Sequence, residues 1–207
     1  MLSIQTLTVG PLQENCYLLS DNDTQQAVLI DPGDEAEQLI AALNGFELTA
    51  VWLTHAHFDH IGALAAVHRQ FPVPVYLHEN DRELFTHAAE SAAFFGLTLE
   101  QPVLETTPLT HAQTLTLGEH EATCLFTPGH APGHIAFYLP EHGTVLAGDA
   151  LFQGSVGRTD LPGGDHAQLL ASIRRELLTL PNETRVLPGH GPETTIGAER
   201  RTNPFLG

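Results

Sequence analysis

The sequence predicts an α/β sandwich with helices on the outside. Short apolar stretches alternate with helical patterns in both halves of the chain. Turn signals rich in glycine and proline separate these stretches. With 42% hydrophobic residues among 207, the chain can build a substantial core in one large domain or two small ones.

Five strands are expected in the N-terminal half, where Leu, Ile, Val and Thr gather. They are residues 2–9, 15–20, 27–30, 48–53 and 73–77. The turn signature Asp31-Pro32-Gly33 closes the third strand. Asp34 is then expected to cap a helix that has Glu37 at the capping-box position and ends near residue 45.

Two more helices are expected in this half. The first follows residue 60 and has Asp59 or His60 as its cap. Its apolar face consists of Ile61, Leu64, Ala65 and Phe71. The second spans residue 81 to about residue 89 and is capped by Asn80. From 91 to 110 the pattern weakens, so this segment is expected to be a packed junction between two halves; a lid over the site is the alternative.

The C-terminal half repeats the alternation of strands and helices. Its strands are expected at residues 113–117, 121–127, 135–139, 143–147 and 185–187. Asp165 is expected to cap a helix over 166–178, with Gln168 completing the capping box. A last helix is expected over 193–201.

Composition excludes several classes of partner. The formal net charge is −17, with 25 acidic residues against eight arginines and no lysine, so nucleic acid is not an expected partner. No secretory leader or membrane-spanning run is evident. Cys16 and Cys124 lie in apolar stretches and are expected to be buried thiols. The sequence therefore predicts a soluble, cytoplasmic protein that does not bind membranes.

Thirteen histidines make a metal site plausible, and one stretch concentrates them. Four metal-capable side chains follow the strand at 48–53 within six positions: His55, His57, Asp59 and His60. Imidazole and carboxylate are good ligands for zinc and other divalent ions. A turn after a strand can point these side chains in two directions, which suits two adjacent ions better than one.

Three further loops place a metal-capable side chain directly after an apolar strand. These side chains are His130, Asp149 and His190, each in a glycine-rich turn. A single Pro-Gly-His segment is usually an ordinary turn with an exposed histidine. The combination of three such loops with the 55–60 cluster instead predicts one metal centre.

This pattern, His-x-His-x-Asp-His followed by His, Asp and His, resembles that of the metallo-β-lactamase superfamily. The resemblance covers the whole chain and implies a four-layer αββα sandwich, a single domain of two similar halves over residues 1–207. It implies two divalent ions, expected to be zinc, with iron or manganese as alternatives. The first ion would bind His55, His57 and His130, the second Asp59, His60 and His190, and Asp149 would bridge both.

Two segments are similar to those of short glyoxalase II-like proteins. They are Asp149 to Asp160 followed by Pro162-Gly-Gly-Asp165, and Thr195 to Phe205. This branch implies hydrolysis of glutathione thioesters such as S-lactoylglutathione by a metal-bridging hydroxide. Asp59 and Asp149 would be catalytic as metal ligands. The chain departs from full-length glyoxalase II because it has no separate C-terminal helical domain.

Arg158 is expected to bind a substrate carboxylate, because glutathione is anionic and the protein is acidic. The alternative is a surface arginine that pairs with Asp160 or Asp165. The resemblance places Asp31 and His134 beside the metals without coordinating them. The remaining histidines are expected in surface or capping roles: 68, 78, 87, 111, 120, 142 and 166.

A second function remains open on the same scaffold. A mononuclear iron persulfide dioxygenase would use a subset of the ligands, such as His55, His57 or His130, and Asp149. A metal-binding module without enzymatic activity would explain the ligands but not Arg158. Oligomeric state is not predicted.

Overall fold

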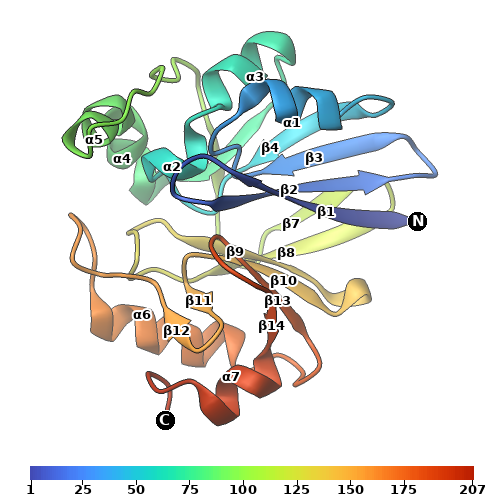
Figure 1. The fold of residues 1–207 in the computed structure, drawn as a ribbon. Helices are drawn as coiled ribbons and strands as arrows, with labels where there is room; N and C mark the ends of the chain where they lie inside the picture. Colours follow the sequence, from blue (N-terminus) through green and yellow to red (C-terminus); the bar gives the residue numbers. More distant parts are fainter. The chain divides into compact units, whose positions relative to one another are not determined.

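The computed structural model describes residues 1–207, which divide into two compact units (Figure 1). The N-terminal unit comprises Met1–Pro108 with Leu117–Glu119, and the C-terminal unit comprises Leu109–Thr116 with His120–Gly207. The main boundary therefore lies inside the junction predicted over 91–110. Each unit contains one six-stranded sheet and its own helices, which confirms the predicted α/β class.

The N-terminal sheet has the strand order β1-β2-β3-β4-β5-β6. Its strands are β1 (Leu2–Val9), β2 (Glu14–Asp21), β3 (Gln26–Ile30), β4 (Glu47–Trp52), β5 (Val75–His78) and β6 (Thr107–Leu109). β1, β2 and β3 are antiparallel neighbours, whereas β3, β4 and β5 run parallel. All five predicted strands are confirmed to within two residues at each end, and only the short β6 was not predicted.

The helices of this unit are short. They are α1 (Ala36–Ala42), α2 (Phe58–Ile61), α3 (Leu64–Gln70), the 3₁₀ turn η1 (Glu79–Asp81), α4 (Arg82–Thr86) and α5 (Ala88–Phe94). Leu39 of α1 and Leu64 of α3 are fully buried in one apolar cluster with Leu29 and Val51 of the sheet. Burial of these side chains holds both helices against the strands. Figure 1 shows α1 and α3 together on one face of this sheet.

The predicted cap at Asp34 is wrong. The residue before α1 is Glu35, which has a φ of 52° and makes no capping hydrogen bond with its side chain. The Asp34 carboxylate instead accepts a hydrogen bond from the Glu35 N–H at 2.7 Å. Glu35 rather than Asp34 therefore occupies the position before the first helical residue, and the capping box between Asp34 and Glu37 does not form.

The helix predicted after residue 60 is also different, because it is two helices, and it begins earlier. α2 starts at Phe58, so Asp59 and His60 lie inside it rather than capping it. The break before α3 follows from contacts with the turn after β3, where the Ala63 N–H donates to the Pro32 carbonyl at 3.0 Å. Asn80 is likewise not a cap, because its N–H donates to His78 Nδ1 at 3.2 Å.

The C-terminal sheet has the strand order β14-β13-β10-β9-β8-β7. Its strands are β7 (Thr114–Leu117), β8 (His120–Phe126), β9 (Ile135–Leu139), β10 (Thr144–Gly148), β13 (Arg185–Pro188) and β14 (Thr194–Thr195). β9 is antiparallel to both β8 and β10, and β10 is parallel to β13. The strands β8, β10 and β13 therefore end at the same edge of the sheet. The five predicted strands are confirmed, and a separate hairpin, β11 (Leu151–Phe152) with β12 (Ser155–Val156), follows β10.

Helices cover one face of this sheet as well (Figure 1). They are α6 (His166–Ser172), which continues into the π-helical turn η3 (Ile173–Leu177), and α7 (Ile196–Thr202); the 3₁₀ turn η2 (Pro140–His142) joins β9 to β10. Leu169 and Ile173 are fully buried against Val145 and Val186.

The cap at Asp165 is confirmed, since its carboxylate accepts from the Gln168 N–H at 2.9 Å. The Asp165 N–H donates to the Gly129 carbonyl, so Gln168 does not complete a capping box. The last helix begins at Ile196 rather than 193, because Thr194 and Thr195 pair with β13.

Both cysteines are free and fully buried, as predicted for Cys16 and Cys124. Burial raises the pKa of the Cys16 thiol well above its ordinary value and that of Cys124 to about 12. No helix in the structure combines the length and the apolar character that crossing a bilayer requires.

Candidate metal centre

The first group of candidate ligands lies at one edge of the N-terminal sheet. β3 and β4 are parallel and pair as far as Ile30 and Trp52, so the segments that follow them leave the sheet together. Asp31 follows β3, and His55 follows β4 after a short turn. Parallel pairing thus explains why a turn aspartate and the histidine cluster meet although they lie far apart in the sequence.

The Asp31 carboxylate organises this group. It accepts hydrogen bonds from the Thr54 N–H at 2.7 Å and from the Thr54 hydroxyl at 2.6 Å. It also lies 3.0 Å from His60 Nδ1. A carboxylate accepts hydrogen bonds there, so the proton of the His60 ring is on Nδ1. The lone pair of His60 Nε2 is therefore available to a metal ion.

The same reasoning fixes the protonation of His55. The single hydroxyl proton of Thr54 is donated to Asp31, so the Thr54 oxygen accepts at its other contact, His55 Nδ1 at 3.0 Å. His55 consequently carries its proton on Nδ1 and presents the lone pair of Nε2. Two imidazoles of the cluster are thus held in the tautomer that binds metals.

The spacing of the candidate ligand atoms fits metal coordination. With metal–ligand bonds of about 2.0–2.2 Å, two ligand atoms on one ion lie roughly 3–3.5 Å apart. His55 Nε2 lies 3.1 Å from His57 Nδ1, within this range, and His60 Nε2 lies 4.0 Å from an Asp59 oxygen, slightly beyond it. The residues of this unit therefore fit a bound metal ion.

Two buried acids near this group were not singled out from the sequence. Asp81 is fully buried and accepts a hydrogen bond from the Ala56 N–H at 3.1 Å. This bond fixes the backbone between His55 and His57. The sequence did contain a signal for Asp81, because this residue follows the predicted strand that forms β5, and β5 is the parallel neighbour of β4. Glu14 is 1% exposed with one oxygen 3.8 Å from His60 Nδ1. No local pattern marks Glu14, because it is simply the first residue of a strand.

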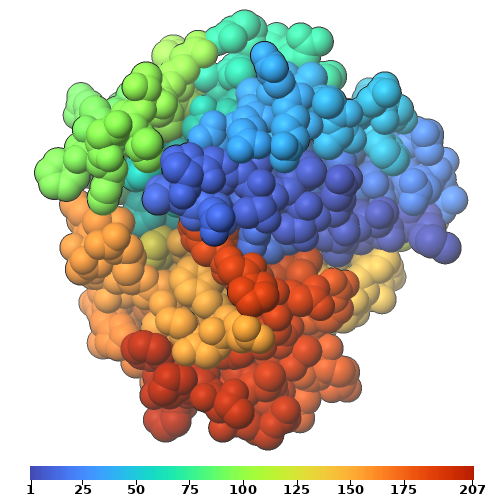
Figure 2. All heavy atoms as spheres, in the orientation of Figure 1, coloured from blue at the N-terminus to red at the C-terminus, as the bar shows by residue number.

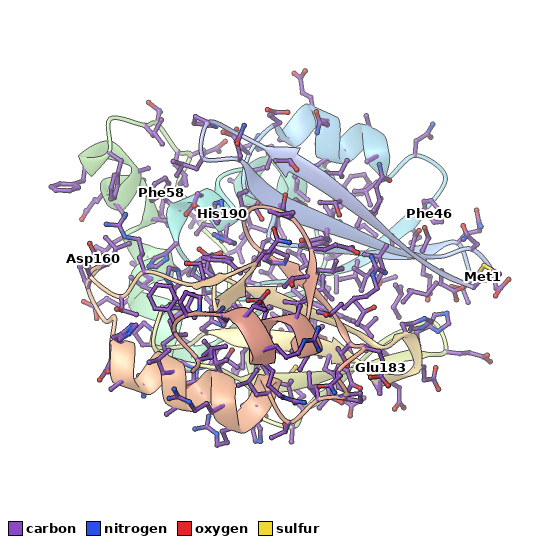
Figure 3. All side chains as sticks on the ribbon, turned by 60° about the horizontal axis from the view of Figure 1, so that its bottom comes forward. Met1, Phe46, Phe58, Asp160, Glu183 and His190 are labelled. Carbon is purple, nitrogen blue, oxygen red and sulfur yellow. The ribbon has the colours of Figure 1, made fainter.

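The second group of candidate ligands belongs to the C-terminal unit. His130, Asp149 and His190 follow the ends of β8, β10 and β13, which lie at one edge of the sheet. One oxygen of Asp149 lies 3.5 Å from His130 Nε2 and 3.6 Å from His190 Nε2. Figure 3 labels His190 on the loop after β13. A carboxylate placed between two imidazoles in this way fits a ligand shared by two ions.

Neighbouring groups orient these side chains too. His130 Nδ1 donates to the Arg158 carbonyl at 2.7 Å, which leaves the lone pair on Nε2, toward Asp149. His134 differs because both of its nitrogens are engaged: Nδ1 contacts the Thr127 hydroxyl at 2.8 Å, and Nε2 accepts from the Asp149 N–H at 3.0 Å. In this structure His134 therefore positions the backbone of Asp149.

Gly157 and Glu199 support the same loop and were also missed. A Cβ atom on Gly157 would lie 1.9 Å from the Asp149 carbonyl oxygen and 3.1 Å from His130 Nδ1, so only glycine fits. Glu199 is 2% exposed and accepts from the Gly154 N–H at 2.9 Å and from the Thr194 hydroxyl at 2.6 Å. It thereby ties the β11–β12 hairpin to α7.

Arg158 forms the ion pair that the sequence offered as its alternative role. Its guanidinium binds both oxygens of Asp160, at 2.7 and 2.8 Å. This pairing lowers the pKa of Asp160 to about 2. Both side chains are exposed, and Figure 3 places Asp160 on an outlying loop of the C-terminal unit. Asp165 takes no part in the pairing, because it caps α6.

A cavity of about 110 Å³ opens beside Asp59 in the N-terminal unit. Its lining is largely apolar and includes Leu12, Phe58, Leu97 and Leu99. Leu97 and Leu99 belong to the 91–110 segment, which was predicted as a packed junction. This segment therefore forms one wall of the cavity. Figure 2 shows this segment, in green, at the surface of its unit, where the Phe94 side chain is 86% exposed. Movement of the segment as a lid stays the alternative to the predicted packed junction.

Comparison with known proteins decides the family. The profile of the Metallo-beta-lactamase superfamily matches residues 9–190. The chain belongs to the metallo-beta-lactamase superfamily. This membership, predicted from the ligand pattern, supports a metal-dependent hydrolase.

Similar proteins cover this superfamily member almost completely. Hydroxyacylglutathione hydrolase GloC of Haemophilus influenzae is 40% identical over 209 residues, which is 99% of this chain and 98% of that protein. The crystal structure of BLEG-1 B3 metallo-beta-lactamase is 44% identical with a TM-score of 0.92, covering 99% of both chains. TTHA1623 in a di-iron-bound form is 50% identical with a TM-score of 0.90, covering 98% of this chain and 100% of that one. These likenesses confirm the metallo-beta-lactamase fold predicted from the sequence.

Proposed function

We propose that the protein is a dinuclear metal-dependent hydrolase of glutathione thioesters such as S-lactoylglutathione. The observation that carries this proposal is the 40% identity, over 99% of the chain, to a protein named hydroxyacylglutathione hydrolase. The strand-end ligands and the two segments similar to glyoxalase II-like proteins support the same substrate class. With this function, two free buried thiols are in keeping with a reducing compartment, and we infer a cytoplasmic location.

We also propose that residues 1–207 act as a single functional domain. His55, His57 and His130 would hold one ion, and Asp59, His60 and His190 the other. Asp149 would bridge them, which its position between two imidazoles within the C-terminal unit supports. When bound, such ions lower the pKa of a shared water and polarise a carbonyl group.

The chain's own residues would supply orientation. Asp31 and the Arg158 carbonyl keep His60 and His130 in the tautomer that presents Nε2. His134 would hold Asp149 in place through its N–H. Arg158 would pair with a carboxylate of glutathione in exchange for Asp160, and the apolar cavity beside Asp59 would receive the acyl group.

The relatives bear on the metal, on the second candidate function and on the substrates to be compared. Iron is the metal of the TTHA1623 structure, so we propose zinc or iron rather than zinc alone. Iron also keeps the mononuclear persulfide dioxygenase as the second candidate. The likeness to a B3 metallo-beta-lactamase makes a β-lactam a necessary comparison substrate.

One preparation with measured metal content tests these alternatives. We expect release of glutathione from S-lactoylglutathione, about two metal ions per chain, and little turnover of a β-lactam. Oxygen uptake with glutathione persulfide at one iron per chain would overturn the proposal in favour of the dioxygenase.

The variant Asp149→Ala tests the proposed bridge. Hydrolysis should fall at least about a thousandfold, because both ions lose a ligand. Glu193→Ala is the matched control, since it removes an exposed carboxylate of the same unit that pairs only with Arg185. Equal activities of the two variants would contradict the role of Asp149.

A further inference from the structure

Two histidines outside the proposed centre approach each other closely in the C-terminal unit. His120 is the first residue of β8, and His142 is the last residue of η2, separated from β10 by Gly143. His142 Nε2 lies 3.2 Å from His120 Nδ1, and the rings meet edge to face with centroids 4.9 Å apart. Glu141 completes a group whose ligand atoms all lie within 4.8 Å of one another.

This group lies at the opposite edge of the sheet from the proposed ligands of the same unit. β8 and β10 run in the same direction because each is antiparallel to β9. His120 begins β8 and His142 lies just before β10, whereas His130 and Asp149 follow these strands. With a rise of about 3.3 Å per residue, the length of β8 separates the two edges by roughly 20 Å. One ion therefore cannot serve both groups.

The separation of the two nitrogens is that of two ligands on one ion. Zinc–nitrogen bonds of about 2.0–2.1 Å at a tetrahedral angle place two ligand atoms roughly 3.3 Å apart. The observed 3.2 Å matches this spacing. An N–H···N hydrogen bond between the two rings would give a similar distance, and a zinc titration distinguishes the two.

The backbone that carries the group is fixed independently of any ion. The Thr144 hydroxyl donates to the His142 carbonyl at 2.9 Å, and the Gly143 N–H donates to the Pro140 carbonyl at 3.2 Å. The Arg185 N–H binds the Gly143 carbonyl at 2.9 Å, which attaches the turn to the next strand of the sheet. A site built on such fixed elements loses little conformational entropy when it binds an ion.

Access and protonation also suit a metal. His120 and His142 are partly exposed and Glu141 is exposed, so an ion can enter from solvent. The ordinary pKa of histidine, about 6.5, leaves most imidazoles neutral at neutral pH, which is the form that binds metals.

We propose that His120, His142 and Glu141 form a second metal site, for a divalent transition ion such as Zn²⁺, whose remaining positions are filled by water. Two imidazoles and a carboxylate select zinc, nickel or copper over calcium and magnesium, which prefer oxygen ligands. The site is independent of the proposed hydrolytic activity and would stabilise the turn between β9 and β10.

The test is a zinc titration of the fully metal-loaded protein, followed by equilibrium dialysis and metal analysis. The wild type should bind one zinc ion per chain more than His120→Ala or His142→Ala. Glu141→Gln should weaken that ion about tenfold or less, because both imidazoles remain. His87→Ala, which removes an exposed histidine of the other unit, is the control and should keep the additional ion.

A second measurement covers variants that fold poorly. Zinc should raise the Tm of the wild type above that of the loaded protein alone, and it should not do so for His120→Gln. Thioester hydrolysis should be unchanged in these variants, which separates this site from the proposed active centre. No additional zinc in the wild type, or the same additional zinc in His120→Ala, would overturn the proposal and leave the pair as a hydrogen bond.

Discussion

His60 Nδ1 lies 3.0 Å from the Asp31 carboxylate, and both side chains are buried in the N-terminal unit. Asp31 also accepts hydrogen bonds from the N–H and the hydroxyl of Thr54. Through the Thr54 hydroxyl it determines the tautomer of His55. One carboxylate therefore prepares two imidazoles for a metal ion. This arrangement leads to the first prediction.

Asp31→Ala should weaken metal binding by about 10- to 100-fold, because the orientation of His60 and the tautomer of His55 are both lost. The free energy of unfolding should fall by about 2–4 kcal/mol, since three buried donors lose their acceptor. Asp31→Asn should recover part of the stability but not the metal affinity. Competition with a chelator and urea unfolding measure the two effects, with Asp34→Ala as the exposed control. Unchanged metal affinity in Asp31→Ala would contradict this role.

Gly157→Ala should lower hydrolytic activity by roughly a hundredfold, because its Cβ would displace the Asp149 carbonyl and His130. Gly154→Asn is the matched control: its φ of 66° is one that Asn tolerates, and a Cβ there meets nothing within 4 Å. Steady-state kinetics and metal content of both variants test the prediction. Full activity in Gly157→Ala would show that the loop adapts without consequence for Asp149.

Arg158→Ala should raise KM for a glutathione thioester about tenfold and change kcat little, because the lost ion pair binds substrate rather than the reacting group. Asp160→Asn should have the opposite effect on KM, since it releases the guanidinium from its internal partner. The two variants together separate a substrate contact from a surface ion pair. If neither variant moves KM, Arg158 has only the surface role.

Cys16 and Cys124 should resist alkylation in the native protein at pH 8 and react fully after unfolding. Both are completely buried, and burial raises the pKa of each thiol, so little thiolate forms in the folded state. Thiol titration with and without denaturant provides the measurement. Rapid modification of either cysteine in the folded, metal-loaded protein would show that its strand opens.

The secondary structure was predicted best where the signal is local. The strands at 2–9 and 135–139 and the cap at Asp165 depend on residues within a few positions, and the structure confirms them. The errors share one cause. Asp34 fails as a cap because Glu35 is left-handed and its carboxylate accepts from the distant Gly10 N–H at 3.3 Å, and the helix after residue 60 breaks where the Ala63 N–H donates to the Pro32 carbonyl.

The sequence alone determined the family of this protein, because metal ligands at strand ends form a pattern that can be read without coordinates. Only the tertiary structure decided which groups hold those ligands. The partners of Asp31, the burial of Asp81 and the approach of His120 to His142 all depend on pairing between strands that are distant in the sequence. Local periodicity records which face of an element is buried, but not which side chain from another strand lies opposite.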